Sequence, residues 1–286
     1  MTYRAWAAQP FDDGEHRITD WPVDVLHPLR HGQVALRMAV CDGIVRACTL
    51  EVGANHRGDE RLLEVRDLRQ GLALVNRHGW LTAAHAETLY ARLAETQLGI
   101  TPSPRALALR DLTMAITDAA TEALWAYVTT ALDGPADPRL LDARERHLTA
   151  LEALTGARMH VTYARIGGVA ADIDPTLLAT LLEHPADAGI AAAAAAVRAA
   201  DGPLAVSLPK VVRLPVGDAY GEITTPHGTL GMWLVGRGDR VPHRVHLRTP
   251  GFRALAALET QAPGMAPAAL LWAIATTRFA PGEVSR

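Results

Sequence analysis

The sequence predicts an α+β fold, a mainly helical bundle with a small mixed or antiparallel sheet built from the N- and C-terminal parts of the chain. Apolar residues alternate near the N-terminus, which is typical of strands, and they recur at helical spacing through the middle of the chain. Strand-like segments return near the C-terminus. Because strands and helices are segregated along the chain and no internal repeat is present, one α+β domain is favoured.

The N-terminal region is predicted to contain a loose segment followed by a hairpin. Residues 1–20 are polar, and a single domain is expected over residues 21–286. Between residues 33 and 40 every second side chain is apolar, a pattern that predicts a half-buried strand. Asp42-Gly43 is a hairpin turn signal, so residues 44–52 are expected to return as a second strand.

Helices are expected to fill the middle of the chain. Between residues 107 and 128 apolar side chains recur at helical spacing and form a stripe suited to packing against other helices. An alanine-rich helix is expected over residues 176–200, and a proline-bounded connector follows it. The other predicted helices cover residues 59–76, 81–98, 140–154 and 266–277, and the other predicted strands cover residues 229–235 and 244–248.

Composition and charge exclude several classes of function. The net charge of −3 at pH 7 gives no basic footprint, so nucleic acid is not an expected partner. The two cysteines, Cys41 and Cys48, are too few for a disulfide framework or for ligating an iron–sulfur cluster, which favours a reducing, cytoplasmic compartment. Neither a secretory signal nor a membrane-spanning segment of ~20 apolar residues is expected from the sequence.

A loop with two histidines precedes the first predicted strand. In His27-Pro28-Leu29-Arg30-His31-Gly32 the proline biases His27 toward an extended conformation. Two histidines on a tight loop could bind a metal, but no cysteine or carboxylate completes a tetrahedral set nearby. The alternative is a surface loop with incidental histidines, and no metal site is predicted.

The 154–172 segment is the most distinctive part of the chain. Thr155-Gly156 ends a helix, and a Gly167-Gly168 pair follows several polar and aromatic residues. These residues include His160, Tyr163 and Arg165. A glycine pair permits positive φ or close backbone approach, so the segment suits a contact surface better than a core. The pair lacks the spaced third glycine of a dinucleotide-binding loop, so NADH is expected to bind elsewhere.

The 154–172 segment resembles the signature of the D subunit of the proton-pumping NADH:quinone oxidoreductase (complex I), which is distantly related to [NiFe]-hydrogenase large subunits. The run from Gly53 to Arg61 is similar to the family's Gly-x-x-His-x-Gly-x-Glu-Lys, and Gly282-Glu283-Val284-Ser285-Arg286 is similar to its Gly-Glu-Val-Asp-Arg ending. The resemblance covers roughly residues 24–174 and 217–286, which implies an internal deletion around residues 175–216. The nickel-binding cysteine pair of hydrogenases has no counterpart here, so hydrogen chemistry is excluded.

The resemblance implies a quinone site. It places His31 on a histidine that hydrogen-bonds a quinone carbonyl, and imidazole can both donate to such an oxygen and supply a proton during reduction. Trp80 falls on the tyrosine that binds the quinone headgroup. This change alters the chemistry, because indole offers one N–H and cannot act as an acid as a phenol can. Asp133 aligns with an aspartate that couples to the histidine of the quinone site.

The resemblance also implies a neighbouring redox centre. Arg77 and His160 align with residues beside a [4Fe–4S] cluster that a partner subunit holds, and His56 falls in a segment that packs against that partner. The expected catalytic residues are therefore His31, Trp80, His160 and Asp133, and the expected cofactor-binding residues are His27, His56, Arg57, Arg77, Tyr163 and Arg165.

The leading hypothesis is a D-subunit-like component of a complex-I-type NADH:quinone oxidoreductase, docked peripherally on the cytoplasmic side of a membrane arm beside other complex-I-type subunits. Its substrate would be a quinone, and the electrons would come from the [4Fe–4S] cluster of the partner subunit, so the chain would bind no redox centre of its own. The alternative is a non-catalytic paralogue that acts as a docking or assembly subunit. The lost tyrosine and the internal deletion favour that alternative.

Overall fold

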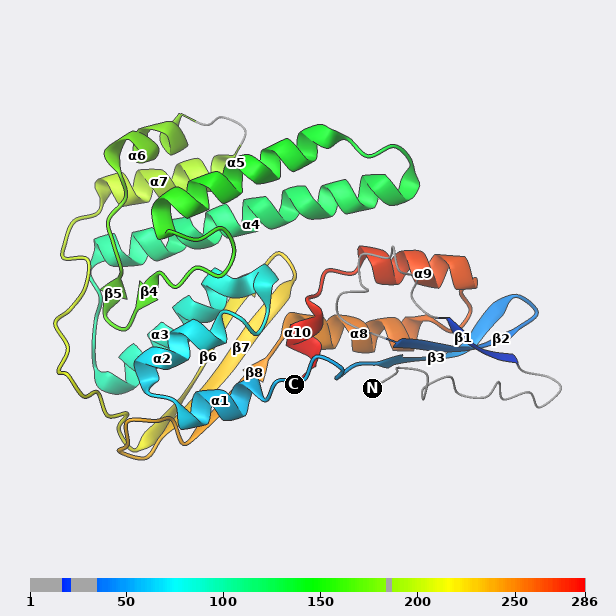
Figure 1. Cartoon of the computed structure of the whole chain (residues 1–286), viewed down its shortest axis with the longest axis horizontal. Coiled ribbons are helices and arrows are strands. Elements are labelled where there is room, and N and C mark those ends of the chain that lie inside the picture. The colour runs from blue at the N-terminus through cyan, green and yellow to red at the C-terminus, as the bar shows by residue number, and fades with distance from the viewer. Residues whose placement is uncertain (1–16, 22–34, 184–186, 286) are drawn as a thin grey trace. The chain divides into compact units, whose positions relative to one another are not determined.

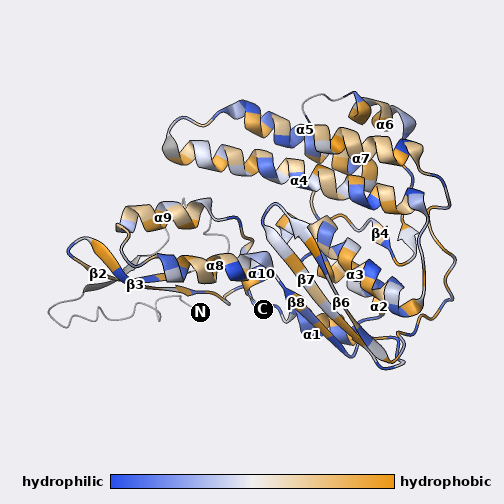
Figure 2. Cartoon of the chain, turned by 180° about the vertical axis from the view of Figure 1, so that it is seen from behind, coloured by the Kyte–Doolittle hydropathy of each residue, from blue (hydrophilic) through white to orange (hydrophobic). Residues whose placement is uncertain are grey.

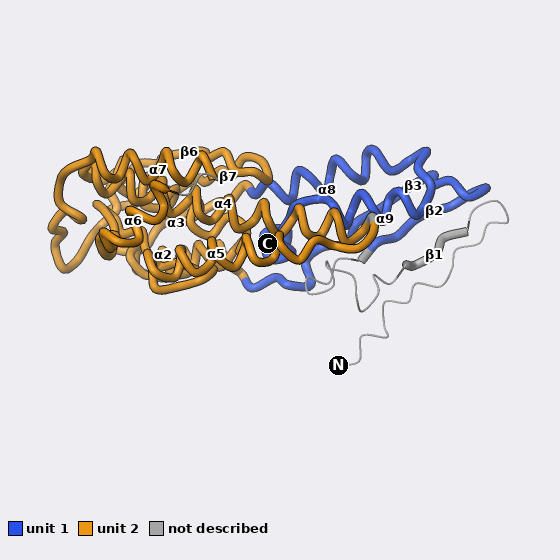
Figure 3. The backbone as a smooth tube through the Cα atoms, turned by 90° about the horizontal axis from the view of Figure 1, so that it is seen from above, with its two compact units in different colours: residues 1–57, 249–286 blue, residues 58–248 orange. Residues whose placement is uncertain are grey.

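The computed structural model describes residues 17–21, 35–183 and 187–285. The chain divides into two compact units, residues 1–57 with 249–286 and residues 58–248 (Figure 3). The loop that carries His27 and His31 lies outside the described residues. The prediction of a loose segment over residues 1–20 and one domain over residues 21–286, with a deletion around residues 175–216, stays a prediction.

The larger unit is built on an antiparallel sheet whose inner face is covered by helices (Figure 1). Its strands are β6 (Gly217–Thr225), β7 (Gly228–Gly236) and β8 (Arg244–Arg248), and the covering helices are α1 (Asp59–Val65), α2 (Leu68–Val75) and α3 (Ala83–Leu98). Leu72, Leu89 and Met232 are among the buried side chains of this core. Each such side chain contributes about 1.5–3 kcal/mol when it leaves water.

A second core in the same unit lies among long helices. These are α4 (Pro104–Asp133), α5 (Pro138–Thr155), α6 (Pro175–Leu182) and α7 (Ala188–Ala199). α4 begins at the N-cap Ser103, whose hydroxyl accepts from the Ala106 N–H, and α5 ends at Gly156 with φ of 79°. Figure 2 shows apolar and polar residues interspersed along α4 and α5, and Leu109, Leu112 and Leu151 are among the apolar residues in this core.

Two predicted helices are each broken into a pair. The helix expected over residues 59–76 divides into α1 and α2 because Asp67 caps the second helix, accepting from the Arg69 N–H at 3.0 Å. Gln70 closes the capping box by accepting from the Asp67 N–H at 3.2 Å. The alanine-rich helix expected over residues 176–200 likewise appears as α6 and α7. The strand β6 is an element that the periodicity did not predict.

The smaller unit contains three strands, the second and third of which pack against helices from the C-terminal part of the chain. The strands are β1 (Arg17–Trp21), β2 (Ala35–Cys41) and β3 (Ile44–Glu51), and the helices are α8 (Pro250–Gln261), α9 (Pro267–Thr276) and α10 (Pro281–Val284). The predicted hairpin is confirmed, with Cys41 opposite Ile44 across the turn. Leu36, Val45 and Leu258 lie in its core.

The fold class is confirmed as α+β, mainly helical with small antiparallel sheets. Among the described strands, however, the N- and C-terminal parts do not share one sheet, because β1–β3 pair only with one another and β6–β8 form their own sheet. The C-terminal part covers the N-terminal strands with α8 and α9, and adds no described strand to them.

Candidate functional site

Glu87 of α3 holds the 154–172 segment in place. Its buried carboxylate accepts from the backbone N–H groups of Tyr163 (3.0 Å) and Ala164 (3.1 Å), and from the side-chain amide of Asn76. Burial raises the pKa of Glu87 to about 7, and the three hydrogen bonds oppose that rise. One buried acid on a neighbouring helix therefore fixes the path of the segment.

A buried ion pair holds the turn between β4 (Ala164–Arg165) and β5 (Gly168–Val169). Nη2 of Arg110 lies 2.5 Å from Oε1 of Glu95, and the same guanidinium donates to the carbonyl oxygen of Gly168 at 2.9 Å. Glu95 also accepts from the Gly167 N–H at 2.6 Å. A Cβ at position 168 would overlap the carbonyl oxygen of Leu204, so glycine is required there.

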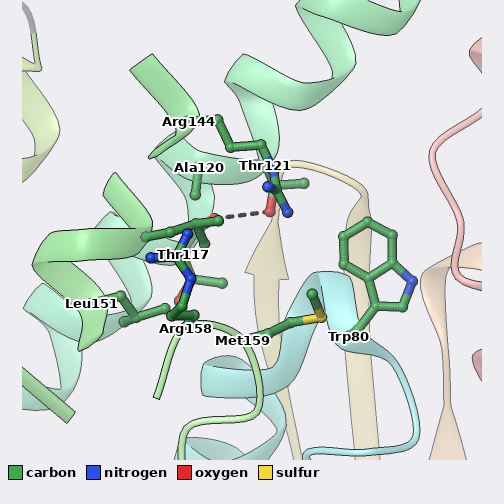
Figure 4. A pocket seen from close by; sticks show the side chains of 9 residues that line it. Trp80, Thr117, Ala120, Thr121, Arg144, Leu151, Arg158 and Met159 are labelled. Atoms are coloured by element: carbon green, nitrogen blue, oxygen red, sulfur yellow. Dashed lines mark hydrogen bonds between the residues drawn. The ribbon is translucent and has the colours of Figure 1, made fainter. Parts of the chain in front are cut away.

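A small hollow opens beside Trp80, the first residue of the 3-10 turn Trp80–Thr82. It has room for about 20 Å³, enough for one water-sized group. Figure 4 shows the Trp80 indole close to the Met159 thioether, with Arg144 and Thr121 at another side of the hollow. The remaining lining residues are Thr117, Ala120, Leu148, Leu151 and Arg158. We call this feature the Trp80 hollow.

Trp80 is oriented by a row of rings. The centroids of Trp80 and Trp125 lie 6.4 Å apart, and those of Trp125 and His227 lie 6.0 Å apart in an edge-on arrangement. Both distances fall in the range where aromatic rings attract one another beyond simple burial. The indole of Trp80 is therefore a positioned, half-buried surface and not a freely rotating side chain.

Two arginines give the Trp80 hollow its positive charge. The guanidinium of Arg158 donates to both carboxylate oxygens of Glu145, at 2.6 and 2.7 Å, and to Glu152 at 3.3 Å. Arg144 makes no side-chain hydrogen bond or ion pair within the described part of the chain. Burial lowers the pKa of Arg144, and the nearby Arg158 charge adds to that effect while Glu145 opposes it.

The structure brings together the segments that carry Arg77, Trp80 and His160. Nδ1 of His160 donates to the backbone oxygen of Asn76 at 3.0 Å, directly before Arg77 in the chain. Arg77 is exposed, and its guanidinium bonds the side-chain oxygen of Asn76 at 3.1 Å. Because Met159 precedes His160 and lines the Trp80 hollow, three of the predicted site residues lie in one local region of the larger unit.

Tyr163 and Arg165 both make contacts within the fold. Tyr163 is buried, its hydroxyl donates to the carbonyl oxygen of Ala171 at 2.8 Å, and burial raises its pKa. Arg165 donates to the backbone oxygens of Thr162 and Ala164, at 2.6 and 3.1 Å. Arg165 also lines a wider groove of about 330 Å³ together with Arg69, Leu72, Thr162, Ile166 and Leu208. Their predicted cofactor-binding roles stay predictions.

His56 and Arg57 do not line the Trp80 hollow. His56 and Arg57 are exposed in the smaller unit, where Nδ1 of His56 donates to the backbone oxygen of Ser285 at 3.2 Å. Asp133 is the last residue of α4. His27 and His31 lie outside the described residues, so their expected roles stay predictions.

Two histidine–carboxylate pairs with buried imidazoles were not predicted from the sequence. Nδ1 of His78 lies 2.8 Å from Oδ2 of Asp59, and Nε2 of His85 lies 3.3 Å from Oδ1 of Asp118. Both imidazoles are buried. Asp59 falls inside the Gly53–Arg61 run that carries the family resemblance, and this is the signal that could have drawn attention to the first pair.

The cysteine content of the chain does not suit an iron–sulfur cluster held by this chain alone. With only two cysteines, the sequence cannot supply the four thiolates that usually ligate a [4Fe–4S] cluster. Within residues 17–21, 35–183 and 187–285, no three His, Cys, Asp or Glu side chains are grouped so that they could hold a metal ion. A cluster near His160 would need ligands from another chain.

Comparisons with known proteins agree with the resemblance that the 154–172 segment carries. The family described as respiratory-chain NADH dehydrogenase, 49 Kd subunit, matches residues 139–187 and 205–286. The resemblance to the D subunit of the NADH-quinone oxidoreductases is thereby confirmed. Its relatives are subunits of an oxidoreductase complex.

Individual relatives are similar at modest identity. A D subunit of the NADH-quinone oxidoreductase of Salinispora tropica, the one numbered 2, is 26% identical over 369 residues, covering 96% of this chain and 95% of that protein. The D subunit of Rhodospirillum rubrum is 34% identical over 160 residues, covering 55% of this chain and 41% of that protein. The first alignment is longer than this chain of 286 residues, so it includes positions with no counterpart here.

A solved structure shares the fold. A chain of the membrane-bound sulfane sulfur reductase, an archaeal respiratory membrane complex, superimposes with a TM-score of 0.83, covering 96% of this chain and 99% of that one. At 18% identity this similarity shows the fold alone. Among the helices with described positions, none is long and apolar enough to cross a bilayer.

Proposed function

We propose that the chain is the D-subunit-like component of a complex-I-type NADH-quinone oxidoreductase and forms part of its quinone site beside a partner's [4Fe–4S] cluster. The observation that carries the proposal is the contact between His160 and the backbone of Asn76. It joins the segment of Arg77 and Trp80 to the segment of His160, so the residues expected at the substrate and at the cluster lie together.

On the substrate side, Trp80 would supply a flat face for a quinone ring. The ring of Trp125 packs against the Trp80 indole and holds it in place. The single N–H of Trp80 can donate one hydrogen bond but cannot supply a proton. A proton would have to come from an imidazole, and His31 is the residue that the family resemblance assigns to that role. The hydrogen bond to Asn76 holds the imidazole of His160 in a set position beside this region.

On the electron side, a bound cluster of the partner subunit would supply the electrons. Arg77 is exposed next to His160, and Arg165 lines the groove of about 330 Å³. Guanidinium groups near a cluster favour its reduced, more negative form. Docking of the partner over this face would place both charges against it.

The proposed location follows from the same assignment. A subunit of this kind would sit peripherally at the cytoplasmic side of a membrane arm, held by other subunits of the complex. The relatives carry the name of NADH-quinone oxidoreductase, and the solved structure with the same fold belongs to a respiratory membrane complex.

The test is purification of the assembled complex through an affinity tag on this chain, followed by assay of quinone reduction. The proposal expects an iron–sulfur protein to co-purify and a short-chain ubiquinone to be reduced. His160→Ala should lower turnover and shift the reduction potential of the cluster, whereas His243→Ala, in the loop between β7 and β8 of the same unit, should change neither. A pure complex without iron–sulfur protein would contradict the proposal.

A docking or assembly role is the second candidate. It is favoured by the small size of the Trp80 hollow, whose space of about 20 Å³ does not admit a quinone ring. In that case the same purification would yield a stable complex in which neither His160→Ala nor Trp80→Ala changes turnover. A complex that reduces quinone only with Trp80 intact would rule this candidate out.

A further inference from the structure

Arg144 is the one cation of the Trp80 hollow whose donors are not used within the described residues. It projects from α5, is partly buried, and makes no side-chain hydrogen bond or ion pair there. A guanidinium carries five N–H donors, and partly removing them from water without a partner is unfavourable. Burial lowers the pKa of Arg144, because the charged guanidinium is less stable when it is partly removed from water.

Arg158 lines the same hollow but, in contrast to Arg144, is paired with carboxylates. Its guanidinium is bonded to Glu145 and Glu152, so its charge is largely compensated by two carboxylates. A ligand that approached Arg158 would have to displace one of these partners. A ligand of Arg144 would have no carboxylate to displace among the described residues. Of the two arginines, Arg144 is therefore the one whose N–H groups are available to a ligand.

The dimensions of the hollow restrict what Arg144 can bind. A space of about 20 Å³ accepts one oxygen-sized group and excludes a ring. Trp80 and Met159 lie at one side of this space (Figure 4), and both present apolar, polarisable surfaces suited to a flat aromatic ligand. A ring that rests against Trp80 with one oxygen directed inward satisfies both features.

We infer that Arg144 is a substrate-binding residue whose guanidinium donates to a carbonyl oxygen of a quinone ring that rests against Trp80. The inference deepens the proposed function and rests on it. The guanidinium supplies no proton, because arginine stays protonated in proteins. Arg144 therefore orients the ring and favours the electron density that builds on the carbonyl oxygen during reduction, while proton supply belongs to another group.

The experiment uses the complex purified through a tag on this chain, with ubiquinone-1 as the probe. Arg144→Gln should raise the KM for ubiquinone-1 about tenfold or more, the effect expected for loss of a hydrogen bond from a charged donor. Arg144→Lys keeps a cationic donor and should recover part of that loss. Arg139→Gln, which changes an exposed arginine at the start of the same helix, should leave KM unchanged.

Each outcome decides between the inference and the function on which it rests. If Arg144→Gln leaves KM within twofold of the unchanged complex while Trp80→Ala raises it, the quinone site stands and the role of Arg144 is wrong. If the unchanged complex neither binds nor reduces ubiquinone-1, the proposed function fails and the inference fails with it. Equal subunit content and melting temperature of the variants exclude misfolding as the cause.

Discussion

Nδ1 of His160 donates to the backbone oxygen of Asn76 at 3.0 Å, and the side chain of Asn76 in turn donates to Glu87. One asparagine thus links the imidazole expected near the redox centre to a buried acid whose pKa is raised to about 7. The position of His160 and the protonation of Glu87 are connected through this residue.

Glu87→Gln should flatten the dependence of stability on pH. Because the folded-state pKa of Glu87 lies above its ordinary value of 4.5, the native protein binds more protons than the unfolded chain between these values. The free energy of unfolding therefore falls as pH rises from 4.5 to 7. A rise of the pKa from 4.5 to about 7 corresponds to a loss of at most about 3 kcal/mol in the free energy of unfolding across this pH range.

The measurement is urea unfolding of the unchanged protein and of Glu87→Gln between pH 4.5 and 8. The variant should gain stability relative to the unchanged protein as pH rises. Glu152→Gln, on the exposed face of α5, serves as the control and should run parallel to the unchanged protein. Parallel curves for Glu87→Gln as well would show that burial of this carboxylate does not govern its titration.

Gly168→Ala should destabilise the larger unit by about 1–3 kcal/mol or more, the cost of forcing extra volume into a packed site. The added Cβ would overlap the carbonyl oxygen of Leu204, which accepts from the Val169 N–H at 2.8 Å. Gly189→Ala in α7 is the matched control, since a Cβ there meets nothing within 4 Å. Thermal melting should show a lower midpoint for the first variant and an unchanged or raised one for the second.

Glu95→Gln should cost about 3–5 kcal/mol, because it leaves the Arg110 guanidinium buried without its counter-charge. The exposed pair of Arg92 and Asp111 provides the contrast. Asp111→Asn should change the free energy of unfolding by no more than about 1 kcal/mol. Chemical unfolding of the two variants compares them directly, and equal losses would mean that the buried pair contributes no more than the exposed one.

The sequence predicted the parts of the fold that depend on local pattern. The hairpin of β2 and β3 follows from alternation and from Asp42-Gly43, and it is confirmed. The break between α1 and α2 was missed, although the capping box of Asp67 and Gln70 is itself a local signal. The separate sheets could not be predicted, because the pairing of distant strands depends on tertiary packing that periodicity does not encode.

In the candidate site, too, the features that follow from local sequence were predicted, and those that depend on tertiary contacts were not. The 154–172 segment was recognised by its residues, but the two acids that hold it, Glu87 and Glu95, lie in an otherwise ordinary helix pattern. Their roles arise from contacts between residues distant in sequence. The available donors of Arg144 likewise become evident only when the described neighbours of its side chain are known.

Variants of Trp80 separate the contribution of its ring from that of its N–H. Trp80→Phe keeps a ring beside Trp125 and removes the only donor, so KM for ubiquinone-1 in the purified complex should rise less than in Trp80→Ala. Trp80→Tyr restores a phenol that can donate and accept, so it should retain or improve turnover. Trp233→Ala on β7, an exposed tryptophan outside the Trp80 hollow, should have no effect. If Trp80→Ala and Trp233→Ala behave alike, the ring of Trp80 does not contact the substrate, and the docking role becomes the better account of this chain.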